Sequence, residues 1–251
     1  MKKIVFSTLL LISASYSAIA QFHQLAGNSN GWYIYTGDHK VSDKWGVHLE
    51  AQLRRNEIIT QPQQLLLRPG INYHFNNQVF ATVGYAFVET YPYGKFPVSR
   101  DFSENRFWEQ IQVKNQLGNV EYISRFRLEQ RYVNSITGTV GNLSEGPSIY
   151  SNRFRLMQRF SVPFKGQKIN DNSFYLTAYD EFFVNFGKNV KFNVLDQNRA
   201  YLALGYKLPK VGRFELGYLN QLVMKPDGIK IENNHTISVS VSSVFAFTRK
   251  K

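Results

Sequence analysis

The feature that most constrains this chain is a long, regular alternation of apolar and polar residues. The clearest run spans residues 45–54, where every odd position is apolar: Trp45, Val47, Leu49, Ala51 and Leu53. The even positions hold glycine or polar and charged residues and end at Arg54. Because successive side chains of a β-strand point to opposite faces, this period of two predicts a strand with one apolar and one polar face.

The same pattern returns along the chain, with turn-forming residues between the runs. Alternating runs lie at 65–75, 79–87, 120–131, 153–162, 199–208, 214–218 and 236–247, with further segments at 32–37, 106–115 and 174–186. Single-chain bacterial barrels normally have an even number of strands. We therefore expect a short additional strand within Phe22–Asn30. The prediction is an all-β fold, a closed antiparallel up-and-down transmembrane β-barrel of twelve strands, with ten as the alternative if residues 32–37 do not pair.

Strand length and aromatic placement favour a membrane barrel over a soluble one, which would bury its apolar face. Runs of about 10–14 residues match the roughly 9–11 that a tilted strand needs to cross a bilayer, whereas soluble strands average about five or six. Aromatic residues gather near the ends of the runs, as interfacial girdles do. The last run ends at Phe245 and Phe247, and barrel-assembly machinery generally reads aromatic C-terminal strands.

The N-terminus has the three parts of a secretory signal. Lys2 and Lys3 precede an apolar stretch from Ile4 to Ile12, and small residues follow at 18–20. We expect residues 1–20 to be a cleaved signal peptide and residues 21–251 to form the barrel domain in the bacterial outer membrane. The chain has no cysteine, which excludes disulfides and thiolate metal sites. Its net charge of +12 points to anionic lipopolysaccharide and outer-membrane lipid as partners, because export makes nucleic acid an unsuitable one.

The connections between runs alternate in length. Residues 39–43, 76–77, 117–119 and 209–212 are short, whereas 57–62, 91–104, 133–149, 187–197 and 224–233 are longer and rich in glycine, proline, asparagine and serine. Short turns at one end and long loops at the other are typical of outer-membrane barrels. Residues 164–173 are an exception, because they are long for the short-turn end.

Several segments resemble an uncharacterised family of bacterial outer-membrane barrels common in Bacteroidetes, domain of unknown function 2490. They cover most of the chain in order: Gln63–Tyr73, Gly84–Gly94, Arg106–Gly118, Arg125–Tyr132, Asn152–Phe164, Ala178–Val190, Asp196–Leu208 and Glu215–Gln221. The resemblance implies the barrel and the Gram-negative outer membrane. It implies no activity, because the family has no established one to carry over.

The most distinctive candidate site is the charged polar face of several runs. Its members are Arg125, Arg127, Glu129, Arg131, Arg153, Arg155, Arg159, Glu181 and Arg199. If they point into the lumen of a small barrel, they form a lattice of ion pairs, with cross-strand pairs worth about 0.2–1 kcal/mol each. Arginine outnumbers acid, so an anion site is the alternative to a purely structural lattice.

Two acids break the pattern. Glu109 and Asp180 fall on the apolar faces of their runs, where a carboxylate facing lipid is costly and is by default a functional candidate. The alternative is a β-bulge that turns the face partway along each strand, and we favour the bulge.

No enzyme motif is found. A strand-borne Ser–His pair needs the two residues two positions apart, so that both lie on one face. The nearest approaches, His39 with Ser42 and His235 with Ser238, are three apart. We therefore predict a non-enzymatic barrel without cofactor or metal and with a charged, side-chain-filled lumen. The alternatives are a narrow channel or binding barrel for small anionic solutes, and a lipid-modifying enzyme.

Overall fold

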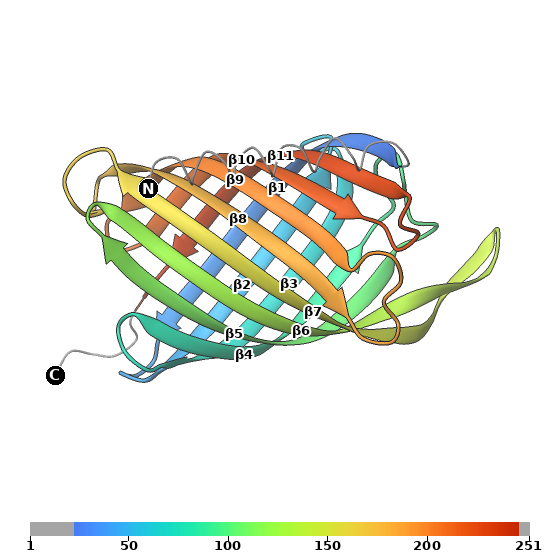
Figure 1. Ribbon diagram of the computed structural model, residues 1–251, viewed down its shortest axis with the longest axis horizontal. Coiled ribbons are helices and arrows are strands. Elements are labelled where there is room, and N and C mark those ends of the chain that lie inside the picture. Colours follow the sequence, from blue (N-terminus) through green and yellow to red (C-terminus); the bar gives the residue numbers. More distant parts are fainter. Residues whose placement is uncertain (1–22, 246–251) are drawn as a thin grey trace, which may run out of the picture.

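The computed structural model describes residues 23–245, which form a closed barrel of eleven strands (Figure 1). No helix among these residues is long and apolar enough to cross a membrane. The strands are β1 (Gln24–Lys40), β2 (Trp45–Asn56), β3 (Gln61–His74), β4 (Val79–Thr90), β5 (Phe102–Leu117), β6 (Val120–Thr139), β7 (Asn142–Pro163), β8 (Phe174–Phe186), β9 (Leu195–Leu208), β10 (Gly212–Met224) and β11 (Lys230–Ser243).

The barrel closes between its first and last strands, and this seam is parallel. Consecutive strands pair antiparallel, but β1 pairs with β11 in parallel from Gln24 opposite Lys230 to Gly37 opposite Ser243. The expected closed all-β barrel is confirmed. The strand numbers of twelve and ten are both wrong, and so is the expectation of antiparallel pairing throughout.

The miscount comes from the even-number expectation, since the eleven alternating runs correspond to the eleven strands and the twelfth strand that we added does not exist. The short strand expected within Phe22–Asn30 and the run at 32–37 are one strand, β1, although Phe22 itself lies outside the described residues. Gly31 carries the strand through this stretch, since a Cβ there would lie 2.1 Å from the Ile58 carbonyl oxygen of the neighbouring turn. A glycine that reads as a break in the sequence is therefore required for close packing.

The barrel is turned inside out relative to a soluble one. Large apolar side chains lie exposed on its outer face around the circumference, for example Leu49, Ile111, Phe126, Leu204 and Ile237. The buried residues between them are mostly polar or charged. This is the orientation that the alternating pattern predicted, with apolar rows outward and arginines inward.

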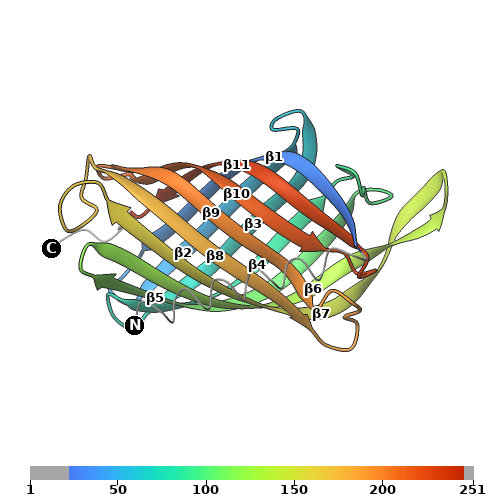
Figure 2. The ribbon, with the colours of Figure 1, turned by 45° about the horizontal axis from the view of Figure 1, so that its top comes forward.

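The two ends of the barrel differ. At the turn end lie residues 41–44, 75–78, 118–119, 164–173 and 209–211; at the loop end lie 57–60, 91–101, 140–141, 187–194 and 225–229. The predicted loop 133–149 is wrong, because β6 and β7 continue as a paired hairpin to a turn at 140–141. Figures 1 and 2 show this hairpin projecting beyond the rim. The long connection 164–173 does lie at the turn end.

A few large side chains also point inward and help to fill the lumen. Trp32, Tyr201, Ala203 and Leu219 pack together as a small apolar cluster. Elsewhere, Gly84 makes room for a second tryptophan, since a Cβ there would lie 2.8 Å from the Trp108 ring.

Candidate functional site

A layer of buried charge crosses the lumen, and we call it the charged belt. It consists of seven arginines and five acids, all buried: Arg54, Arg68, Arg106, Arg127, Arg153, Arg155, Arg199, Glu50, Glu104, Glu129, Glu181 and Asp196. They come from β2, β3, β5, β6, β7, β8 and β9, whose inward faces meet inside the barrel.

Glu129 is the centre of the belt and is fully buried. Its carboxylate accepts hydrogen bonds from Arg153 Nη2 at 2.5 Å and from Arg155 Nη1 at 2.7 Å. Three more guanidinium groups lie within 4.0 Å of it, those of Arg68, Arg106 and Arg127. Such charge-assisted bonds are about twice as strong as neutral ones, so this carboxylate organises the middle of the lumen.

Two other acids, Glu104 and Glu181, each accept hydrogen bonds from two arginines. Glu104 accepts from Arg106 Nε at 2.6 Å and from Arg131 Nε at 2.5 Å. Glu181 accepts from Arg125 Nη2 and Arg155 Nη2, both at 2.8 Å. Because Glu104, Glu129 and Glu181 are shared, the five acids tie together more arginines than their own number, although Glu50 and Asp196 pair with one arginine each.

Aromatic rings make cation–π contacts with guanidinium groups that the acids only partly neutralise. Arg54 and Arg199 lie 3.9 and 4.9 Å from the centre of the Trp32 ring. Arg127 lies 4.6 Å from the centre of the Trp108 ring. A cation over an aromatic face is attracted to the ring quadrupole, and more strongly where water is excluded.

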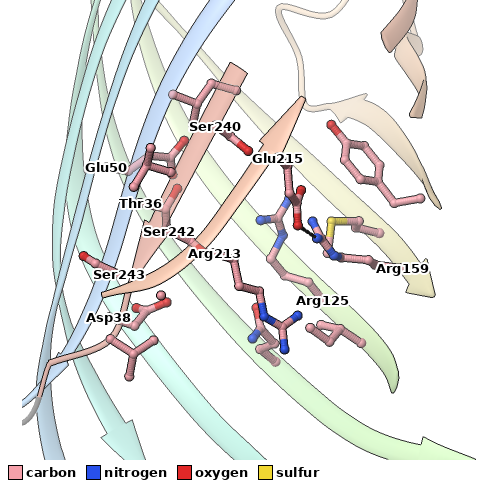
Figure 3. A pocket seen from close by; sticks show the side chains of 18 of the residues that line it. Thr36, Asp38, Glu50, Arg125, Arg159, Arg213, Glu215, Ser240, Ser242 and Ser243 are labelled. Atoms are coloured by element: carbon pink, nitrogen blue, oxygen red, sulfur yellow. Dashed lines mark hydrogen bonds and ion pairs between the residues drawn. The ribbon is translucent and has the colours of Figure 1, made fainter. Parts of the chain in front are cut away.

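Two cavities lie on either side of the belt. The cavity at the turn end has a volume of about 650 Å³, and that at the loop end about 510 Å³. Belt residues Arg68, Arg155 and Arg199 line both. In the turn-end cavity, arginines of β6, β7 and β10 face acidic and hydroxyl side chains of β1, β2 and β11 (Figure 3).

The segment 91–101 leans into the loop-end mouth. The Tyr93 hydroxyl donates to Glu232 Oε2 at 2.9 Å, and the Lys95 N–H donates to Asn28 Oδ1 at 3.2 Å. Gly94 has φ of +66° and would place a Cβ 2.5 Å from Asn28 Oδ1. Burial raises the pKa of Tyr93 above its ordinary value, and the neighbouring Glu232 carboxylate adds to this shift. The segment is thus anchored to both seam strands.

The nine charged residues singled out in the sequence do converge inside the barrel, but not in one cluster. Six of them belong to the charged belt: Arg127, Glu129, Arg153, Arg155, Glu181 and Arg199. Arg125 and Arg131 are partly exposed and bind belt acids. Arg159 stands apart, since it pairs with Glu215 on the turn-end side (Figure 3).

Glu109 and Asp180 both lie on the outward face, so the bulge that we favoured is wrong. The register of β5 with β4 and β6 is unbroken through Glu109. Around Asp180, the shift in β8 occurs only later, between Phe183 and Val184. Amide side chains take up part of the cost of these two carboxylates, because Gln130 Nε2 and Asn198 Nδ2 donate to them at 3.1 and 2.9 Å.

In the two nearest His–Ser approaches of the sequence, Ser42 and His235 have other partners. Ser42 Oγ accepts from the Trp45 N–H, and His235 contacts the Tyr218 hydroxyl on the outer face. An imidazole–carboxylate contact does form, from His48 Nδ1 to Asp38 Oδ1 at 2.8 Å. Its second nitrogen faces another acid rather than a hydroxyl. Among residues 23–245, no group of three or more potential ligand side chains could hold a metal ion.

Sequence reasoning missed several belt members, among them Glu50, Arg54, Arg68, Glu104 and Arg106. The signal was present, since Glu50 and Arg54 lie on the polar face of the clearest alternating run. What the sequence lacks is the placement of non-neighbouring strands. That placement brings Arg68 of β3 to within 3.5 Å of Glu129 of β6.

Comparison with known proteins places the chain in a family. Residues 29–232 match the family described as "Protein of unknown function (DUF2490)". The chain belongs to this family. A DUF2490 assignment carries no activity with it. The chain is also 28% identical, over 95% of its length and 96% of the relative, to an uncharacterised protein of Methylorubrum extorquens. No solved structure matches it.

Proposed function

We propose that this DUF2490 protein is a barrel of the bacterial outer membrane whose lumen is closed by the charged belt and which has no catalytic activity. The observation that carries this proposal is the inside-out distribution of its side chains. A soluble barrel would bury its apolar rows and expose its charges. Here Ile111 and Leu204 are about half exposed while Glu129 is fully buried.

The outer face also fits a bilayer in its details. Aromatic pairs lie near the turn end, such as Trp45 with Tyr73 (ring centres 4.9 Å apart) and Phe174 with Tyr206 (4.7 Å). Aromatic rings near the strand ends are typical of the girdles at membrane interfaces. Under this proposal, lipid contacts the outer rows, the basic rim meets lipopolysaccharide, and barrel-assembly machinery inserts the chain.

The location is tested by fractionating cells that express the full chain and comparing heated with unheated samples by electrophoresis. We expect the protein in the outer-membrane fraction, with faster migration when unheated because the closed barrel stays compact. Recovery in the soluble periplasmic fraction would overturn the proposal.

The closed lumen is tested separately in planar bilayers. Because the belt side chains lie between the two cavities, the native protein is expected to be silent. A variant with Arg127→Ala, Glu129→Ala and Arg155→Ala removes the middle of the belt and is expected to conduct. Conductance by this variant, added in the same way, shows that the barrel can insert under the conditions of the assay.

An anion channel is the second candidate, and one observation favours it: cavities lined by arginines reach the belt from both ends. Steady anion-selective current from the native protein, reduced in Arg127→Ala or Arg155→Ala, would support the channel and refute the closed lumen.

A further inference from the structure

The loop-end cavity has an unbalanced charge. Nine cationic side chains line it, but only two carboxylates do, Glu104 and Asp196. Some of these cations pair with carboxylates that do not line the cavity, as Arg153 and Arg155 do with Glu129. The excess positive charge of the cavity therefore comes from the cationic side chains that have no close carboxylate partner.

Arg54 is one of the cations left over. Its Nε donates to Gln52 Oε1 at 2.9 Å, and its Nη1 donates to Gln64 Oε1 at 2.6 Å. These amide oxygens satisfy hydrogen bonds but bring no negative charge. The side chain is only 8% exposed, and a buried charge without a counter-charge is strongly unfavourable.

Arg199 is the second. Its closest carboxylate is that of Glu181, 4.0 Å from Nη1, and its direct hydrogen bond goes to the neutral Gln197. Its Nε is buried without any hydrogen-bond partner. Arg54 and Arg199 pack on the same Trp32 ring and line the same cavity, so two under-neutralised guanidinium groups lie at one place.

The walls above them carry a group of apolar side chains among polar ones such as Thr90 and Asn189. Near the mouth the cavity is lined by Phe96 and Val98 of the covering segment, Val133 and Ile149 of the projecting hairpin strands, and Val223 and Met224 at the end of β10. A cationic floor beneath this group of apolar side chains suits a ligand with a charged head and an apolar body.

We propose that the loop-end cavity binds an amphiphilic organic anion, with its carboxylate or phosphate head at Arg54 and Arg199 and its apolar part beneath segment 91–101. A planar guanidinium binds both heads through paired hydrogen bonds. The cavity volume of about 510 Å³ lies within the range of small-molecule sites, roughly 300–1,000 Å³. This inference goes beyond the closed outer-membrane barrel and does not depend on where the protein resides.

The test is a binding titration on the full chain in nanodiscs of zwitterionic phosphatidylcholine, which avoids anionic lipid. Trp45→Phe and Trp108→Phe leave Trp32 as the sole tryptophan, in contact with both arginines. Octanoate and octyl phosphate are the probes, and octanol, octylammonium and inorganic phosphate are the comparisons. We expect saturable changes in Trp32 emission with the two amphiphilic anions, and whichever binds more tightly identifies the preferred head.

Substitutions then assign the binding to the two arginines. Arg54→Gln and Arg199→Gln are each expected to weaken binding at least tenfold, and Arg54→Lys to weaken it less. Arg54 holds no carboxylate, so its replacement leaves no acid stranded. Arg55→Gln is the matched control, because Arg55 is the next residue, bonds to the backbone oxygens of Ile59 and Thr60, and should leave affinity unchanged.

Three results would overturn the proposal. One is octanol binding as tightly as octanoate, which would reveal a merely apolar pocket. Another is equal weakening by Arg55→Gln. The third is the absence of a saturable response in a barrel that still migrates as a compact species when unheated.

Discussion

Replacing Glu129 with glutamine tests whether one carboxylate organises the charged belt. The substitution keeps the shape of the side chain but removes the charge that faces Arg153 and Arg155. Breaking a buried ion pair costs about 3–5 kcal/mol because the remaining charge is left unpaired. Arg153 keeps Asp196 and Arg155 keeps Glu181. We therefore expect a loss at the lower end, about 3 kcal/mol.

The measurement is urea unfolding of the reconstituted barrel, followed by tryptophan fluorescence and by heat-dependent migration. Glu109→Gln is the comparison, since the same substitution is made on the outer face at a residue with one amide hydrogen bond. Its free energy of unfolding should fall by no more than about 1 kcal/mol, because only one hydrogen bond, from a neutral amide, is lost. If Glu129→Gln destabilises no more than Glu109→Gln, the belt does not depend on its central carboxylate and the reasoning fails.

Three further predictions follow from single contacts. Leu49→Arg puts a charge on the outer face in the middle of β2 and should lower stability in a bilayer by about 2–4 kcal/mol, whereas Leu49→Phe should be nearly neutral; equal effects would argue against lipid contact. Gly84→Val drives side-chain atoms into Trp108 and the Pro69 carbonyl and should leave little compact species on unheated gels, while Thr82→Val nearby should fold. Burial raises the pKa of Tyr93, and a raised pKa favours the protonated form in the folded state. The contact with Glu232 should therefore stabilise the closed segment fully below about pH 10, the ordinary tyrosine value, and this stabilisation should decline progressively above it. Proteolysis of segment 91–101 should accelerate there in the native protein, whereas Tyr93→Phe should show no such rise.

Much of the architecture is predictable from the sequence because a β-strand has only two faces. The run from Trp45 to Arg54 already shows which side chains point outward, and the structure keeps that assignment along the whole strand. The inward direction of Arg127 and Glu129 follows in the same way. These are local properties, set by a repeat of two residues.

The failures concern information that is not local. The twelfth strand came from the even-number rule, whereas the structure extends β1 through Gly31, which packs against a turn in another hairpin. The belt depended on which arginine meets which acid across the lumen, as with Arg68 and Glu129. Those distances come from strand tilt and stagger around the closed barrel, and alternation along one strand does not encode them.

The parallel seam places the start of the first strand and the end of the last strand at opposite rims, whereas an even-stranded barrel has both at one rim. β1 starts at one rim and β11 finishes at the other, with Gln24 beside Lys230 and Ser243 beside Gly37. A linker joining the two ends would have to run back roughly 45 Å along the strands, from about 3.3 Å per residue. Circular permutation by a short linker is thus excluded, and cargoes fused before β1 and after β11 would sit at opposite mouths of the same cylinder.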